Sequence, residues 1–210
     1  FRDYVRVYTD CPDKSPDKMS PPDYADYVAE CLAKFDPDDL YIHMPGILEI
    51  ARIHSLLSVI KENIIEFNNA IENIMNLLKN SPALAKTDEL VNILTRAESY
   101  MVKLRAIRID EKKKYRLKYI QERNKIVRNP MLTIALQLMV RYTFDVRNDI
   151  SNAMNYYGEK LKELQDLYDN SRDDLIRNRI QKVMELLSRM NQDILTNISK
   201  DIDGLTQILR

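Results

Sequence analysis

The chain has 210 residues, of which only three are glycine, 45% are hydrophobic and 30% are charged. This shortage of glycine excludes a dinucleotide-binding fingerprint, a phosphate-binding loop and a nucleophile elbow, because each needs several glycines at fixed spacing. The 32 basic side chains equal the 32 acidic ones, so the zero net charge gives no general attraction to nucleic acid or to a membrane.

The N-terminal 21 residues are expected to form an irregular arm, because prolines stand at positions 12, 16, 21 and 22. A short helix over residues 22–35 should follow it, with Ser20 as its cap. The two cysteines, Cys11 and Cys31, either form one bridge between the arm and this helix or remain thiols. Two thiols are favoured, since a disulfide scaffold would need more cysteines.

The clearest pattern predicts a long helix over residues 47–79, preceded by Pro45-Gly46. Nine large apolar residues recur there with alternating spacings of three and four, which is a heptad seam. They are Ile50, Ile53, Leu57, Ile60, Ile64, Phe67, Ile71, Ile74 and Leu78.

A second long helix is predicted over residues 88–128, beginning near Thr87. Its apolar seam stops after Leu104 and resumes at Leu117, Ile120 and Val127. Either one helix runs through this gap or the helix breaks near Ile109, and one helix is favoured.

Two further long helices are predicted over residues 131–168 and 172–209, with residues 131–140 the most buried segment of the protein. Ser171 and Asp174 resemble a capping box for the last helix. Short turns between long helices favour antiparallel neighbours. The predicted fold is therefore all-α: a single elongated antiparallel bundle of four long helices over residues 22–210, with the short N-terminal helix and the irregular arm 1–21.

No set of residues in the sequence forms a catalytic or metal-binding motif. Neither His43 nor His54 has a glutamate three residues before it, as a di-iron bundle site requires. Carboxylate pairs such as Glu62 and Glu66 lie between seam positions, where solvent exposure is expected. We therefore predict no catalytic residue, no cofactor, no metal and no small-molecule substrate, and hence no enzymatic activity.

One segment is strongly basic, because residues 103–128 carry eleven basic side chains and three acidic ones. On a helix, such a basic stripe beside tyrosines can neutralise phosphates and stack bases, or it can bind acidic protein. The candidate contact residues are Lys112, Lys114, Arg116, Lys118, Arg123, Lys125, Arg128, Tyr115 and Tyr119.

The sequence thus favours a non-enzymatic interaction or assembly protein that self-associates or binds a protein partner. The alternative is a nucleic-acid-binding helical subunit that uses residues 112–128 to coat or scaffold a polymer. No apolar stretch is long enough to span a membrane, and a cytoplasmic location is expected.

Overall fold

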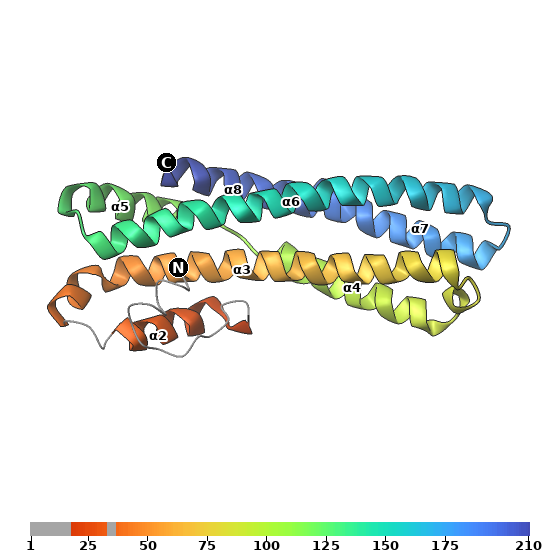
Figure 1. Cartoon of the computed structure of the whole chain (residues 1–210), viewed down its shortest axis with the longest axis horizontal. Coiled ribbons are helices and arrows are strands. Elements are labelled where there is room, and N and C mark those ends of the chain that lie inside the picture. Colours follow the sequence, from red (N-terminus) through yellow and green to blue (C-terminus); the bar gives the residue numbers. More distant parts are fainter. Residues whose placement is uncertain (1–17, 33–36) are drawn as a thin grey trace. The chain divides into compact units, whose positions relative to one another are not determined.

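The computed structural model describes residues 18–32 and 37–210. Every regular element in these ranges is helical, which confirms the all-α class (Figure 1). Most of the predicted arm, including Cys11, lies outside the described residues, as do the side chains of Cys31 and His43. The elements are α2 (Pro21–Leu32), α3 (Pro37–Asn80), η2 (Leu84–Lys86), α4 (Asp88–Ala106), α5 (Glu111–Val127), α6 (Pro130–Asn170), α7 (Asp174–Arg189), η3 (Met190–Leu195) and α8 (Thr196–Leu209).

The chain divides into two compact units, which differs from the single bundle domain expected over residues 22–210. Unit 1 contains the described residues of Phe1–Ile60 together with Arg108–Arg147 and Lys200–Arg210, and unit 2 contains Lys61–Ile107 and Asn148–Ser199. Helices α3, α6 and α8 each contribute residues to both units. Within the described ranges, none of the helices combines the length and apolar character that a membrane span requires.

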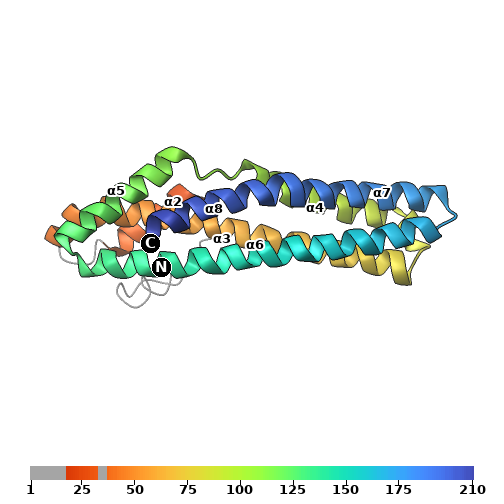
Figure 2. The same cartoon turned by 90° about the horizontal axis from the view of Figure 1, so that it is seen from above.

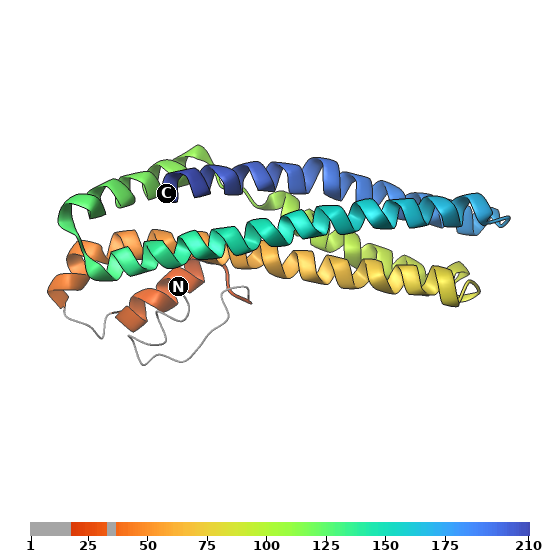
Figure 3. The same cartoon turned by 45° about the horizontal axis from the view of Figure 1, so that its top comes forward.

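In unit 1, α3 and α6 run parallel. Gly46 lies beside Leu132, and the hydroxyls of Ser58 and Tyr142 are hydrogen-bonded at 2.8 Å, so residue numbers rise together along both helices. Helix α2 lies alongside the first part of α3 (Figure 3). The rings of Tyr24 and His54 stack between these helices, with centroids 6.2 Å apart.

In unit 2, α3 and α6 are also parallel. The hydroxyl of Tyr156 donates a hydrogen bond to Glu72 at 2.7 Å, and Lys79 forms an ion pair with Glu163. The two residues of each pair are 84 positions apart in the sequence. Parallel helices in register require such a constant separation.

The prediction of one helix over residues 88–128 is wrong, because this segment forms two helices, α4 and α5, with a break between them (Figure 2). Ile107 and Ile109 are buried whereas Arg108 and Asp110 are exposed, which is the two-residue alternation of extended backbone. Asp110 then caps α5, since its Oδ1 accepts a hydrogen bond from the Lys113 amide at 2.8 Å. A helix running through this segment could not bury both isoleucines.

Helix α3 begins at Pro37 and runs through Pro45 and Gly46, which were expected to precede it. A proline removes one intrahelical hydrogen bond, and the turns on both sides of Pro45 remain helical. The heptad prediction for α3 is confirmed: all nine seam residues, from Ile50 to Leu78, are buried.

The caps and the burial of the other helices agree only in part with expectation. Helix α4 begins directly after Thr87, as expected, and Thr87 caps it. Helix α7 is capped by Asp173 and not by Ser171, since Asp173 Oδ1 accepts hydrogen bonds from the amides of Leu175 and Ile176. The start of α6 is not buried on all sides. Its buried positions 132, 135, 136 and 139 have helical spacing, so one side faces the core, and Gln137 is exposed.

The helix expected over residues 172–209 contains a π-helical turn, η3, between α7 and α8. The buried residues Met190, Ile194, Ile198 and Ile202 follow one another at intervals of four. Four residues exceed the 3.6 of an α-helical turn, so a regular helix would rotate these side chains away from the core. The wider π-helical turn contains one extra residue and so keeps these four side chains on the same side of the helical segment.

Candidate functional site

All nine candidate contact residues lie on α5 or directly after it, in unit 1. The backbone hydrogen bond from Lys113 lowers the pKa of the Asp110 carboxyl, so this cap is ionised at neutral pH and favours the helix start. Helix α5 carries seven basic and two acidic residues, which gives it a net charge of +5.

Lys114 joins α5 to α8 instead of facing solvent. Its Nζ lies 3.0 Å from Glu111 and 3.5 Å from Asp201. The hydrogen bond to Glu111, together with the charge of Asp201, raises the pKa of Lys114. Gly204 leaves room for this side chain, because a Cβ there would lie 3.1 Å from Lys114 Cε. Lys114 is therefore occupied by contacts within unit 1.

The remaining basic candidates divide into paired and unpaired side chains. Arg116 forms an ion pair with Glu49 at 3.6 Å, and Lys125 forms one with Glu122 at 2.8 Å. The hydrogen bond from Lys125 lowers the pKa of Glu122. The other four are exposed and form no ion pair with any residue that the structure describes: Lys112, Lys118, Arg123 and Arg128.

Apolar side chains are unusually exposed on the same helix. Tyr115 is 72% exposed, Tyr119 57%, Ile126 83% and Val127 51%. Tyr115, Tyr119 and Ile126 are four and seven residues apart, so they lie on one side of α5. Val127 was expected to face the bundle and does not. We call these four residues, together with the exposed Lys112, Lys118, Arg123 and Lys125, the α5 face.

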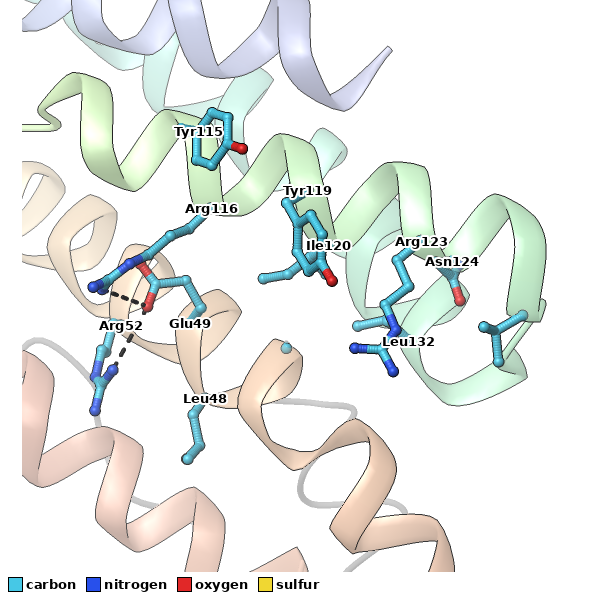
Figure 4. A pocket seen from close by; sticks show the side chains of 12 residues that line it. Leu48, Glu49, Arg52, Tyr115, Arg116, Tyr119, Ile120, Arg123, Asn124 and Leu132 are labelled. Carbon is cyan, nitrogen blue, oxygen red and sulfur yellow. Dashed lines mark ion pairs between the residues drawn. The ribbon is translucent and has the colours of Figure 1, made fainter.

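A groove of about 510 Å³, lined in part by the α5 face, lies between α5, residues 46–52 of α3 and the start of α6 (Figure 4). Figure 4 shows Arg116, Tyr119 and Arg123 extending from α5 toward α3. We call it the α5 groove. Its apolar lining comes from Leu48, Ile120, Val127 and Leu132, and its basic lining from Arg52, Arg116 and Arg123.

One acidic residue, Glu49, lines the α5 groove. Its side chain is only 8% exposed, and it forms ion pairs with Arg52 and Arg116, each at 3.6 Å. Sequence analysis did not identify Glu49 or Arg52 as site residues. The pair three residues apart on α3 is visible in the sequence, but the contact with Arg116 depends on how α3 and α5 pack.

A polar network holds the end of α5 against α6. The Asn124 side-chain amide donates to Thr133 Oγ1 at 2.8 Å, and its Oδ1 accepts from the Asn129 backbone N–H at 3.1 Å. Asn129 Oδ1 in turn accepts from the Leu132 amide at 2.9 Å. Arg128, at φ 52°, reverses the chain between the two helices. These bonds fix the groove wall that contains Ile120 and Leu132.

The chemistry of this surface is that of binding: guanidinium donors, tyrosine rings and aliphatic side chains. Among the residues that the structure describes, no three His, Cys, Asp or Glu side chains come together as metal ligands would. Comparisons with protein-family models, with curated proteins and with solved structures give no match to this chain.

Proposed function

We propose that the protein is a non-enzymatic interaction protein that binds an acidic partner protein through the α5 face. One observation carries this proposal. Among the described residues, nine large apolar side chains are exposed, and four of them lie on α5. They lie on a helix of net charge +5, so apolar and basic side chains share one surface.

Exposed apolar side chains that cluster in this way are typical of a binding surface. Tyrosine and arginine are among the residue types that contribute most to binding energy at protein interfaces, and the α5 face with its groove has both. Covering the Ile126 side chain alone would contribute on the order of 1.5–3 kcal/mol.

The charge of α5 selects the kind of partner. Two copies of α5 packed against each other would bring two helices of net charge +5 together, and that repulsion disfavours direct self-pairing. An acidic partner gains attraction from the same charges. Lys112, Lys118 and Arg123 are the side chains expected to supply it.

Nucleic acid is the second candidate ligand, supported by the unpaired Lys118 and Arg123 beside Tyr119. Two observations favour protein over nucleic acid as the ligand. Ile126 and Val127 cannot contact phosphate favourably, and Lys114, Arg116 and Lys125 are already paired with carboxylates.

The test measures the affinity of the full chain for a fluorescein-labelled peptide by anisotropy. The probe is a synthetic three-heptad peptide with leucine at its a and d positions and glutamate on its flanks. We expect binding that weakens as salt is raised, and a loss of about tenfold or more in Ile126→Ser, which removes the apolar side chain without changing the charge. Val102→Ser is the matched control, because Val102 is 62% exposed on α4 in unit 2.

Polyglutamate and a single-stranded oligonucleotide are run beside the peptide. Polyglutamate should bind more weakly than the peptide, because it lacks apolar side chains. If the oligonucleotide binds and the peptide does not, the second candidate replaces the first. If Val102→Ser weakens peptide binding as much as Ile126→Ser does, the α5 face is not the binding surface.

A further inference from the structure

The α5 groove shares Tyr115, Tyr119, Arg123 and Val127 with the α5 face, and residues of α3 and α6 complete its lining. Its volume of about 510 Å³ falls in the range of pockets that enclose a small ligand or a few side chains. Leu48, Ile120 and Leu132 line it with aliphatic surface. An apolar group that entered the groove would be removed from water and would pack against these side chains.

The rim of the groove keeps hydrogen-bond donors for an anion. Glu49 lies 3.6 Å from both Arg52 and Arg116, which is longer than a hydrogen bond of 2.7–3.2 Å. Arg123 forms no ion pair with any described residue. The lining therefore contains three guanidinium groups and one carboxylate, which gives it a net charge of +2.

The groove is held in shape before any ligand arrives. Gly46 has no side chain, so α3 lies close to Ile120 and Leu132, whose atoms would be 3.4 and 3.5 Å from a Cβ at this position. The hydrogen bonds of Asn124 fix α5 against α6. A site that is already formed loses less conformational entropy on binding.

We infer that the α5 groove takes an apolar side chain of the acidic partner, while a neighbouring carboxylate of that partner pairs with Arg123. This inference rests on the proposed function, because it assumes that the α5 face binds an acidic protein segment. A purely apolar segment would remove water from the arginines without giving them a carboxylate partner. A polyanion without apolar groups would leave the aliphatic side chains of the groove exposed to water. An acidic segment with an apolar side chain satisfies both parts of the lining.

The experiment uses the three-heptad leucine–glutamate peptide with two groove variants of the full chain. Arg123→Glu replaces the unpaired rim cation by an anion, and Leu48→Glu places a carboxylate inside the groove, where it occupies the arginines. Each should lower the affinity by about tenfold or more. Arg105→Glu, at an exposed position of α4 in unit 2, makes the same charge change as Arg123→Glu and should leave the affinity unchanged.

A second measurement makes the result specific to the groove. A peptide set in which each leucine is changed to alanine in turn identifies the side chain that contributes most. That substitution should cost much less affinity in Leu48→Glu than in the wild-type chain, because the groove is then already occupied. Circular dichroism confirms that each variant keeps its helical content before binding is measured.

The outcomes separate the two proposals. If Ile126→Ser abolishes peptide binding but Leu48→Glu behaves like Arg105→Glu, the proposed function stands and the groove inference is wrong. If the peptide binds no better than polyglutamate, both are wrong. Loss in all three variants, with the leucine effect removed in Leu48→Glu, supports both.

Discussion

Helices α4 and α5 have similar lengths, 19 and 17 residues, but different interactions hold them in their units. In α4 the buried side chains are all apolar, and they recur at helical spacing: Leu90, Ile93, Ala97, Met101 and Leu104. In α5 only two side chains are buried, Leu117 and Asn124. Helix α4 is therefore attached to unit 2 by a continuous apolar stripe, and α5 to unit 1 by a single leucine and a set of polar contacts.

The polar contacts of α5 are Lys114 with Asp201, Arg116 with Glu49, and the hydrogen bonds of Asn124. Partly exposed ion pairs contribute little to stability, with a median of about 0–1 kcal/mol. They do fix the position of a helix. A helix held in this way can expose tyrosine and isoleucine side chains to solvent. The large apolar side chains that α4 exposes are two valines, Val91 and Val102.

The largest expected effect follows from removing a single buried leucine from each helix. Leu117→Ala and Leu104→Ala both delete a side chain with no exposed surface, and each should lower the free energy of unfolding by about 2–4 kcal/mol. Because α5 has no other buried apolar side chain, Leu117→Ala should also abolish amide-exchange protection throughout α5. Leu104→Ala should leave most of α4 protected. Equal loss of protection in the two helices would contradict the comparison.

An intermediate effect is expected for Asn124→Ala. The substitution leaves the Asn129 backbone N–H without its acceptor, and the free energy of unfolding should fall by about 1–3 kcal/mol in urea titration. Asn92→Ala, at an exposed position of α4, is the matched control and should change it by less than about 0.5 kcal/mol. Similar values for both variants would show that the network does not hold α5.

The smallest effect compares two glycines inside helices. A Cβ at Gly158 of α6 meets nothing within 4 Å, so Gly158→Ala should raise the free energy of unfolding by about 0.5–1 kcal/mol. A Cβ at Gly204 of α8 approaches Lys114, so Gly204→Ala should gain less and should weaken the contact of Lys114 with Asp201. An equal gain at both positions, measured by thermal unfolding, would show that Lys114 moves away without cost.

Residue periodicity predicts the parts of the molecule that depend on one helix at a time. The nine seam residues of α3 are all buried, because a large apolar side chain every three to four residues leaves only one way to face a core. The break at Ile107–Asp110 also has a local signal in the sequence, two isoleucines two residues apart followed by a capping aspartate. One continuous helix was nevertheless favoured, because the residues on both sides of the break have a helical pattern.

The candidate site could be predicted only in part. The basic residues and tyrosines of α5 are consecutive in the sequence, so their shared helix was evident. Which of them remain unpaired depends on Glu49 and Asp201, which come from distant helices. Spacing alone also placed Val127 in the core, although it lines the groove and is half exposed.

The π-helical turn η3 has a consequence for how this chain tolerates changes in length. It holds one residue more than an α-helical turn needs, and Gln192 and Asp193 within it are exposed. Deleting Gln192 would return the segment to regular α-helix while Ile198 and Ile202 keep their orientation. The same deletion inside α7 would swing every later side chain by about 100°. In the last helical segment of the described chain, this turn is thus the one place where a single residue can be deleted without changing which side chains face the core.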